Sequence, residues 1–529
     1  MNVDSPLYLA LDQGGHSSRA FVFDSSGDII ARAQVPITTQ VSRVSLNNEN
    51  QTQHTSVSST SALANAPDNK TAPADSKADT QKRIEHSAAE LAASLRTCCQ
   101  QIGYALGDKC AHITQAGLAT QRSSIVCWRR STGTAITPVL SWQDRRAADY
   151  IDARFDNSDL VEDLTGLVMS PHYGASKLRW CLDNEHNVRE AAKACDLTIG
   201  PLASFLARTL TGATHDVCDP ANASRTLLWN RHTKVWSTRL CELFGIDQTL
   251  LPESVPTRYD FGRIRVGAYS IPLRLVTGDQ SAAIYAFGQA SPSTAFINLG
   301  TGAFMQCPIG QKTADVDGLL NSVVYQDETR IEHVLEGTVN GAGRALTWWS
   351  ERHNRDVRTL VKEALDLLQT KTEFARNVPV FLNGISGLGS PYWRSHFKSR
   401  FVAGPGNEGV QPRPHAGAIA ILESIAFLLN ANLVRAAVHV PLNQLILTGG
   451  LASVDYLCRS LADISGITTV RSTLREATAH GTGYLLAQSD HWQDTGQLTT
   501  FDVRNNENLL ARHKTWQTLM AGALGSTDT

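Results

Sequence analysis

Residues 7–23 read LYLALDQGGHSSRAFVF, and this stretch decides the fold. It places two apolar runs, Leu7 to Leu11 and Arg19 to Phe23, on either side of a glycine turn. Short apolar runs separated by Gly-rich turns are typical of β-hairpins. A similar pattern returns at 273–280, LRLVTGDQ, and at 295–307, AFINLGTGAFMQC. The repetition predicts two similar halves in which strands end in glycine turns.

Helical periodicity fills the sequence between these strand signals. The clearest helical stretches are Ile84–Ile102, Lys177–Asn184, Val339–Arg352 and Ala416–Ala437. Strands that alternate with helices are typical of sheet-centred α/β lobes. We therefore expect one lobe at 1–260 and a second at 261–529, with the ligand site in a cleft between the lobes.

Residues 41–80 differ in composition from the rest of the chain. They are rich in Ser, Thr, Asn, Gln and Ala and contain no aromatic residue. Such a stretch buries too little apolar surface to offset the entropy lost on ordering. We interpret it as a flexible surface insertion in the first lobe.

Charge and composition exclude several classes of protein. The 529 residues carry 48 Lys and Arg against 50 Asp and Glu, a net charge of −2, so no field of one sign gathers nucleic acid or anionic lipid. The apolar stretch Ala416–Leu429 is interrupted by Glu423 and is too short to span a bilayer. Neither a signal peptide nor a Cys-x-x-Cys pair is present, so we expect reduced thiols and a cytoplasmic location. The expected partners are small molecules, with neither nucleic acid nor membrane, and self-association into a homo-oligomer stays open.

Four glycine turns lie beside predicted strands: Gly14-Gly15, Gly300-Thr301-Gly302, Gly387-Leu388-Gly389 and Gly449-Gly450. Backbone N–H groups without a crowding Cβ can approach phosphate oxygens closely. Each turn taken singly is equally explained as a tight connection. Their repetition at strand ends favours phosphate binding.

Asp12 and Asp279 each follow an apolar strand. A carboxylate at this place can hold Mg²⁺ through water or accept a proton from a substrate. The alternatives are an Asx turn at Asp12 and a helix N-cap at Asp279. Residue spacing alone leaves both interpretations open.

Gln121-Arg122, Trp142 and Asp144-Arg145-Arg146 form an aromatic and basic set. A Trp ring offers a flat apolar wall and Arg a fork of donors for a polyhydroxylated ligand. The alternative is a core Trp beside a structural ion pair. The sequence contains no Walker A loop, GxGxxG motif or nucleophile elbow, which excludes P-loop and Rossmann nucleotide sites.

Taken together, these motifs resemble the FGGY family of carbohydrate kinases, and most closely its members that phosphorylate glycerol. The resemblance runs along nearly the whole chain outside 41–80. Its motifs occur in family order: LALDQG at 9–14, GLATQR at 117–122, WQDRR at 142–146, KLRW at 177–180, GDQ at 278–280, GTGAF at 300–304, GLGSPYW at 387–393 and GG at 449–450. So many ordered matches predict two ribonuclease-H-like (actin-like ATPase) lobes that close over ATP and a small polyol or sugar.

The resemblance also implies roles for individual residues. Asp279 is implied as the general base, and Asp12 as the carboxylate associated with Mg²⁺. The implied acceptor-binding residues are Arg122, Ser123, Trp142, His172, Asp279 and Phe304. The implied nucleotide-binding residues are Asp12, Gly14, Arg19, Gly300, Thr301, Gly302, Gly343, Thr347, Gly449 and Gly450.

Several positions depart from the family pattern. Gly15-His16 replaces two threonines of the phosphate hairpin, Ser123 replaces an acidic residue that grips glycerol, and His172 replaces a tyrosine. In the nucleotide half, Thr347 and Arg459 replace glutamines. Loss of a carboxylate that accepts from two hydroxyls weakens glycerol binding by roughly 1–3 kcal/mol if nothing replaces it. Glycerol is therefore one candidate acceptor among several.

Three functional hypotheses follow. The first is an ATP-dependent kinase for a hydroxyl of a small polyol or sugar, which uses both carboxylates, Arg122 and Trp142. The second is a non-catalytic sensor of the same fold that binds sugar or nucleotide, supported only by the departures above. The third is an actin-like filament ATPase, which has no use for the Arg122 and Trp142 acceptor wall.

Overall fold

The computed structural model describes residues 5–45, 52–58, 80–402, 411–492 and 496–525. The chain forms two compact units, each built from three segments. Unit 1 comprises Met1–Gln289, Ser322–Glu332 and Glu476–Thr495, and unit 2 comprises Ala290–Asn321, His333–Arg475 and Gly496–Thr529.

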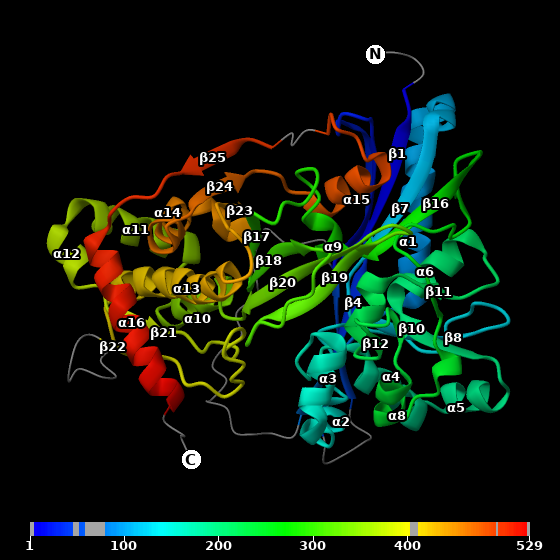
Figure 1. Cartoon of the computed structure of the whole chain (residues 1–529), viewed down its shortest axis with the longest axis horizontal. Helices are drawn as coiled ribbons and strands as arrows, with labels where there is room; N and C mark the ends of the chain where they lie inside the picture. Colours follow the sequence, from blue (N-terminus) through cyan, green and yellow to red (C-terminus); the bar gives the residue numbers. More distant parts are fainter. Residues whose placement is uncertain (1–4, 46–51, 59–79, 403–410, 493–495, 526–529) are drawn as a thin grey trace. The chain divides into compact units, whose positions relative to one another are not determined.

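The main sheet of unit 1 has the strand order β15-β16-β7-β1-β2-β3. Its strands are β1 (Leu7–Gln13), β2 (Ser17–Phe23), β3 (Ile29–Pro36), β7 (Ile113–Thr120), β15 (Arg263–Val266) and β16 (Tyr269–Gly278). β7 pairs parallel with both β1 and β16, whereas β2, β3 and β15 pair antiparallel with their neighbours. Figure 1 shows β1, β7 and β16 side by side. The glycine-turn hairpin predicted at 7–23 is confirmed.

Side-chain alternation along β1 assigns its two faces. Leu7, Leu9 and Leu11 join the core under α1 (Ala88–Leu106) and α6 (Leu202–Thr211). Ala10 instead joins a cluster that includes Ala479 of α15 (Ala477–Ala487). Because side chains alternate along a strand, Asp12 lies on the same face as Ala10.

A second sheet in unit 1 has the order β10-β8-β9-β6-β4-β5. Its strands are β4 (Thr38–Ser45), β5 (Thr52–Ser58), β6 (Thr80–His86), β8 (Ile125–Arg129), β9 (Val139–Leu140) and β10 (Leu197–Pro201). The interpretation of 41–80 as an insertion without regular structure is therefore wrong for 41–45 and 52–58, where backbone pairing with neighbouring strands replaces the apolar burial that the composition lacks. The rest of that prediction, at 46–51 and 59–79, lies outside the described residues.

The helix predicted at Ile84–Ile102 begins later than expected. Ile84 pairs with Val41 in the β4–β6 ladder, and α1 starts only at Ala88. Ser87 ends the strand because its hydroxyl accepts a hydrogen bond from the Glu90 N–H at 3.3 Å and caps the helix.

Short elements complete unit 1. They are α2 (Ala148–Asp152), α3 (Ser158–Thr165), α4 (Gly174–Asn184), α5 (His186–Lys193), α7 (Pro220–Ala223), α8 (Thr238–Phe244), α9 (Asp279–Ala283), β11 (Val217–Cys218), β12 (Trp229–Asn230), β13 (Val235–Trp236) and β14 (Glu253–Ser254).

The main sheet of unit 2 has the order β19-β20-β18-β17-β23-β24-β25, although residues 322–326 of β19 and 331–332 of β20 are grouped with unit 1. Its strands are β17 (Thr294–Leu299), β18 (Ala303–Gly310), β19 (Leu320–Gln326), β20 (Ile331–Val339), β23 (Gln444–Thr448), β24 (Thr468–Ser472) and β25 (Leu498–Phe501). β17 pairs antiparallel with β18 and parallel with β23, as β1 does with β2 and β7. When five strands are numbered in chain order within each unit, both units have the strand order 3-2-1-4-5, which is β3-β2-β1-β7-β16 in unit 1 and β20-β18-β17-β23-β24 in unit 2. This repeat confirms the predicted α/β fold of two ribonuclease-H-like lobes.

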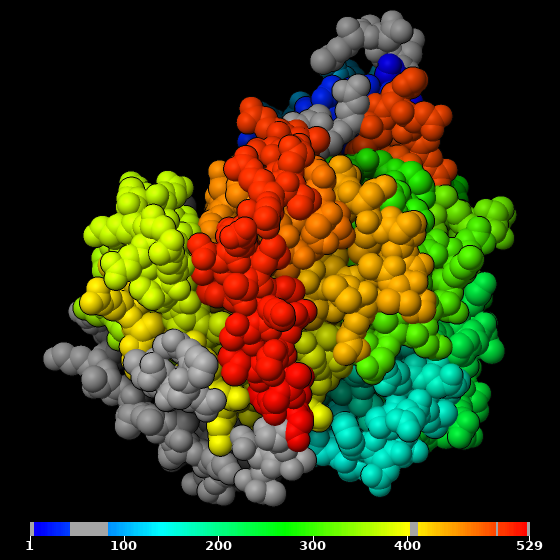
Figure 2. Space-filling view, turned by 60° about the vertical axis from the view of Figure 1, so that its left-hand side comes forward, coloured from blue at the N-terminus to red at the C-terminus, as the bar shows by residue number. Residues whose placement is uncertain are grey.

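Helices and one small sheet surround this plan. They are α10 (Gly343–Arg352), α11 (Val357–Thr370), α12 (Thr372–Arg376), α13 (Pro414–Ala437), α14 (Asp455–Ser465), α16 (Glu507–Gly525), β21 (Val380–Leu382) and β22 (Arg400–Val402). In Figure 2, α16, drawn in red, lies along the surface of unit 2, where it packs on α13 and α14. Among the described residues, α13 is the one helix long and apolar enough to cross a membrane. However, 89% of its most apolar stretch is buried within the fold, so it is a core helix.

The first unit extends beyond the lobe boundary that the sequence placed at residue 260. Residues Tyr269–Gly278 form β16, whose Val276 and Thr277 pair with β7 in the middle of the unit 1 sheet. The unit consequently continues to Gln289. Asp279, expected in the second lobe by its number, belongs to unit 1.

Candidate active site

Three adjacent parallel strands of unit 1 end at the same edge of the sheet. Asp12 of β1 pairs with Ala119 of β7, which pairs with Thr277 of β16. Gln121 and Arg122 follow β7, and Asp279 follows β16. The carboxyl ends of parallel strands meet at one edge. The structure therefore brings Asp12, Arg122 and Asp279 to the same edge of one sheet.

Asp12 is buried, with 4% of its surface exposed. Burial raises the pKa of its carboxyl to about 7; Arg19 opposes the rise, whereas Asp279 and Glu476 add to it. Arg19 Nη1 lies 3.6 Å from Asp12 Oδ2 and 2.6 Å from Glu476 Oε2. The Arg19 guanidinium thus forms ion pairs with both Asp12 and Glu476.

Asp279 is the first residue of α9. Its Oδ1 accepts a hydrogen bond from the Gln280 N–H at 2.7 Å, and its carboxylate also accepts from the Arg122 backbone N–H. Burial raises its pKa, and the Arg122 charge together with these hydrogen bonds opposes the rise. The group is held in place and is more basic than an exposed aspartate.

Arg122 packs directly on Gly278. A Cβ added to Gly278 would lie 2.5 Å from both Cγ and Cδ of the Arg122 side chain. Only a glycine before Asp279 leaves room for the arginine stem. The glycine of the Gly278-Asp279-Gln280 motif thus positions Arg122 near the Asp279 carboxylate.

Glu476 is a functional candidate that the sequence reasoning missed. It occupies the N-cap position of α15 and reaches the carboxylate edge from a segment remote in the chain. Thr478, two residues on, donates from Oγ1 to the Asp279 carbonyl at 3.3 Å. No local pattern distinguishes Glu476 from other acidic residues that precede helices.

Asp12, Asp279 and Glu476 are three neighbouring carboxylates of unit 1 that could hold a divalent cation. The described residues contain no group of three His, Cys, Asp or Glu already arranged as metal ligands. The mutual repulsion of these carboxylates is nevertheless what a cation relieves, and Mg²⁺ is often held by one or two carboxylates with its remaining positions filled by water. The residues therefore fit a water-mediated Mg²⁺ site.

Ser123, Trp142 and His172 lie on neighbouring segments beside Arg122 and are together called the acceptor wall. The ring centroids of Trp142 and His172 lie 6.0 Å apart with planes at 35°. Ser123 has a positive φ of 63°, which turns the chain sharply after Arg122. The backbone N–H of Trp142 donates to Ser124 Oγ at 3.1 Å, which connects the segment after Arg122 with the segment that carries Trp142.

His172 is neutral at neutral pH. Burial and the nearby Arg145 and Lys177 charges lower its pKa to about 4. Arg145 Nη2 lies 2.6 Å from Nε2, which must accept, so the ring proton resides on Nδ1 and is donated to the Trp142 carbonyl at 3.1 Å. Both ring nitrogens are thus hydrogen-bonded, Nδ1 to the Trp142 carbonyl and Nε2 to Arg145, and these two bonds fix the orientation of the ring.

Unit 2 brings most of the predicted nucleotide residues together. The Gly343 N–H donates to the Gly300 carbonyl and the Arg344 N–H to the Thr301 carbonyl, each at 3.0 Å. Gly343 begins α10, four residues later than the helix start predicted at Val339, which instead ends β20. Thr347 Oγ1 donates to the Gly343 carbonyl at 3.1 Å. The β17–β18 turn and the N-terminus of α10 therefore form one surface.

Gly449 adds the end of β23 to this surface. Its φ is +90°, and a Cβ there would lie 2.5 Å from the Leu299 carbonyl oxygen. Gly450 follows with open space around it. Gly302 lies under Phe304, whose ring would be 3.7 Å from an added Cβ. Close backbone packing therefore explains the glycine at 449 but not the one at 450.

The hairpin at Gly14 in unit 1 is the counterpart of the Gly300–Gly302 turn. The Gly14 N–H donates to the Ser17 carbonyl at 3.1 Å. The Gly15 carbonyl accepts from Thr39 Oγ1 at 3.2 Å, and the His16 side chain is exposed. The two threonine hydroxyls of the family pattern are replaced by a glycine and an exposed histidine, which leaves backbone groups as the hairpin's donors.

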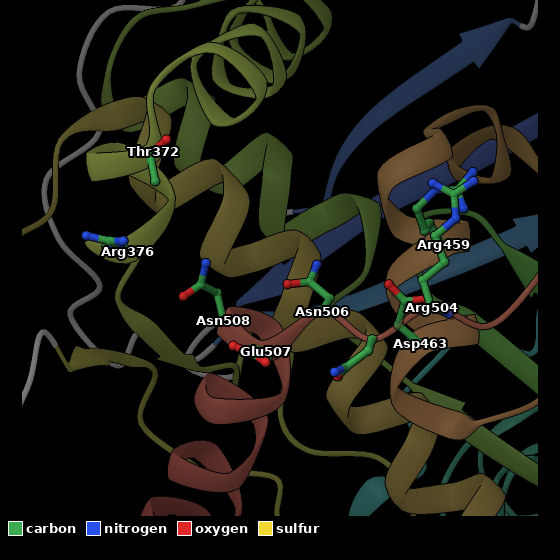
Figure 3. A pocket seen from close by; sticks show the side chains of 9 residues that line it. Thr372, Arg376, Arg459, Asp463, Arg504, Asn506, Glu507 and Asn508 are labelled. Carbon is green, nitrogen blue, oxygen red and sulfur yellow. The ribbon is translucent and has the colours of Figure 1, made fainter.

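A separate polar pocket of about 560 Å³ lies in unit 2 (Figure 3). Its lining residues are Thr372, Arg376, Arg459, Asp463, Arg504, Asn505, Asn506, Glu507 and Asn508. Arg459, assigned by the sequence to the nucleotide half, lines this pocket with Asp463, whose carboxylate accepts from the Arg504 N–H at 2.8 Å. None of the other predicted site residues lines it.

Comparisons with known proteins agree with this architecture. Residues 64–284 match the N-terminal domain model of the FGGY family of carbohydrate kinases, and residues 295–489 match the C-terminal domain model. The glycerol kinase of Shewanella frigidimarina is 30% identical over 93% of this chain and 91% of its own length. The glycerol kinase of Trichlorobacter lovleyi is 32% identical over 93% and 92%.

Solved structures share the fold. The Plasmodium falciparum glycerol kinase with ADP has a TM-score of 0.79 at 22% identity, over 99% of both chains. The gluconate kinase of Lactobacillus acidophilus has a TM-score of 0.75 at 17% identity, again over 99% of both chains.

Proposed function

Because this chain belongs to the FGGY family of carbohydrate kinases, we propose that Asp279 is the general base with which it activates its acceptor. The enzyme transfers a phosphoryl group from ATP to a hydroxyl of a small polyol or sugar. The observation that supports the assignment is the shared strand edge of Asp12, Arg122 and Asp279, with raised pKa values at both carboxylates. The sensor and filament hypotheses are set aside.

Asp279 accepts the proton of the attacking hydroxyl. A raised pKa improves a carboxylate as a base, because proton transfer is most effective when the pKa approaches the working pH. The Gln280 and Arg122 backbone N–H groups orient the carboxylate, so that it loses little freedom when substrate binds. The Arg122 charge favours the ionised form of this carboxylate.

Asp12 would hold Mg²⁺ through water, with Glu476 near it. When bound, Mg²⁺ neutralises charge on the transferring phosphoryl group. Arg19 contributes a fixed positive charge between Asp12 and Glu476. In unit 2, Thr301 and Gly302 would offer backbone N–H groups to phosphate, while the Gly343 and Arg344 N–H groups hold this turn through the Gly300 and Thr301 carbonyls.

Arg122, Ser123, Trp142 and His172 of unit 1 would bind the acceptor; Phe304, which the resemblance adds to this set, belongs to unit 2. A flat ring beside polar groups suits a carbon chain that bears several hydroxyls. Because Ser123 supplies a hydroxyl where the family has a carboxylate, the acceptor is glycerol or a larger relative of it, such as a tetritol, pentitol, ketose or gluconate.

The test is ADP release by the purified protein with MgATP and each of these acceptors. The Asp279→Asn variant keeps side-chain volume but cannot take the proton, and we expect its kcat to fall about 10²- to 10⁴-fold while ATP affinity stays within a few fold. Asp502→Asn, at an exposed position, serves as the matched control and is expected to match the wild type. Wild-type turnover by Asp279→Asn would remove the base assignment.

We also propose a cytoplasmic location. All ten cysteines are free thiols and nine of them are buried, which suits a reducing compartment. Fractionation of the native host, with detection of the protein in a membrane or secreted fraction, would contradict this.

A further inference from the structure

Lys177 of α4 is a buried charge to which neither the proposed chemistry nor the resemblance gives a role. It is 0% exposed. Its Nζ donates to three backbone carbonyls, those of Ser123 at 2.8 Å, His172 at 2.9 Å and Ser141 at 3.1 Å. Burying an ammonium is costly unless its donors are satisfied, and here each of the three has an acceptor.

The three carbonyls belong to three segments that are separate in the chain. Ser123 lies between β7 and β8, directly after Arg122. Ser141 follows β9 and precedes Trp142, and His172 precedes α4. Each segment carries one side of the proposed acceptor wall, so one ammonium group joins the backbones behind all three.

We infer that Lys177 is a positioning residue that sets the acceptor wall by holding the Ser123, Trp142 and His172 segments at fixed separations. It acts from behind the wall through backbone carbonyls and does not touch the acceptor. The inference rests on the proposed acceptor site. It concerns acceptor binding and leaves the nucleotide surface of unit 2 unaffected.

Other charged groups around Lys177 are already engaged. Asp144 and Arg146 form a buried ion pair at 2.7 Å, and Asp144 also accepts from the Ile84 N–H at 2.7 Å. Arg145 is hydrogen-bonded to His172, and the Cys181 thiol, with a pKa raised well above its usual value by its Cys127 hydrogen bond and burial, stays neutral. The carbonyl oxygens are therefore the direct partners of the ammonium.

The protonation of Lys177 provides an independent readout. Burial lowers the pKa of its amine to about 7; Asp144 opposes this shift, whereas Arg145 and Arg146 favour it. The ammonium has three N–H donors and the neutral amine two, so one of the three carbonyls loses its partner as the pH rises past that value. We expect the acceptor KM to rise between about pH 6 and 9 while the KM for MgATP changes less.

The test compares Lys177→Met and Lys177→Gln with the wild type. Methionine has a similar length and no donor, whereas glutamine retains two N–H groups on a shorter stem. We expect the acceptor KM to rise roughly 10- to 100-fold for Lys177→Met and by less for Lys177→Gln, with the KM for MgATP within about 2-fold. Lys193→Met, at an exposed lysine on the next helix, is the control and is expected to match the wild type.

The outcomes separate this inference from the proposed function. Wild-type protein without acceptor-stimulated ADP release would contradict the proposed function. With an active wild type, an unchanged acceptor KM in either variant would overturn the role of Lys177. Equal rises in both KM values would also overturn it, because they indicate a general loss of structure. If Lys177→Met does not fold, the acceptor KM of Lys177→Gln and the pH dependence of the wild-type acceptor KM test the inference instead.

Discussion

At the scale of single residues, electrostatics rather than residue identity distinguishes the carboxylates of unit 1. An aspartate in a turn is ordinary, and the sequence leaves Asp12 open as a turn former. The structure leaves it 4% exposed, and this burial raises its pKa to about 7, with Arg19 opposing the rise and Asp279 and Glu476 adding to it. Perturbed carboxylates at a strand edge are a frequent mark of a functional site.

Replacing Asp12 should stabilise the protein and disable it. The folded-state pKa of about 7 exceeds the ordinary 3.8, so the folded chain binds the proton more tightly and stability falls as the pH rises from about 4 to 7. Asp12→Asn, which never ionises, should raise Tm by several degrees at pH 8 without Mg²⁺, with a smaller gain at pH 5. Turnover should fall more than about 100-fold, because a metal contributes several kcal/mol to the transition state.

Calorimetry at the two pH values and ADP release measure the two effects. Asp28→Asn, exposed in the turn between β2 and β3, should change neither. A lower Tm for Asp12→Asn at pH 8 would show that the ionised carboxylate stabilises the fold and would contradict this electrostatic account.

At the scale of elements, a glycine in a turn is either required by close backbone packing or leaves open space around it, and the sequence alone does not distinguish the two. Gly449 and Gly450 are adjacent and identical in the sequence. Gly449 has φ +90° and backbone oxygen within 2.5 Å of an added Cβ, whereas Gly450 has nothing within 4 Å. The first glycine is required by the close packing of β23 on β17, and the second is free to serve a ligand.

The pair Gly449→Ala and Gly450→Ala tests this difference. We expect Gly449→Ala to lower the free energy of unfolding by about 1–3 kcal/mol, because alanine at that φ is strained and its Cβ meets the Leu299 carbonyl. Gly450→Ala should change stability by less than about 0.5 kcal/mol. Denaturant unfolding measures both, and equal losses would contradict the packing argument.

Element boundaries follow a related rule. The glycine-turn hairpins were predictable because strand alternation and turn residues are encoded within a few positions. The start of α1 was not, since Ile84 fits a helical period equally well as it fits a strand. Its pairing with Val41 of β4 decided the outcome, and that partner depends on tertiary structure.

At the scale of the whole molecule, residues 46–79 fall between strands β4 and β6 of the second sheet of unit 1, which is not part of the repeated strand plan. In unit 1, β4 and β6 pair antiparallel up to Ser45 and Thr80, which lie opposite each other at the open end of the ladder. β5 adds only an edge strand beyond β4. The interruption is thus inserted at the tip of a β4–β6 hairpin.

Replacing residues 46–79 by Asn-Gly should leave a folded, active enzyme. A two-residue Asn-Gly turn suits an antiparallel hairpin whose last pair is Ser45 and Thr80. A shorter loop also costs less closure entropy, so we expect Tm to stay within a few degrees and kcat/KM within about 3-fold. Thermal unfolding and ADP release measure the result, and insoluble protein would show that β5 is needed for folding.

The sequence by itself determined the repeated α/β architecture, the glycine turns and the family of the enzyme, because these depend on local alternation and on ordered motifs. Tertiary structure alone decided which distant residues meet: Glu476 with Arg19, Lys177 with three carbonyls, and Asp279 within unit 1 rather than unit 2. It also decided the protonation of Asp12 and His172. Desolvation and charge coupling depend on every atom within a few ångströms, and most of those atoms come from remote parts of the chain.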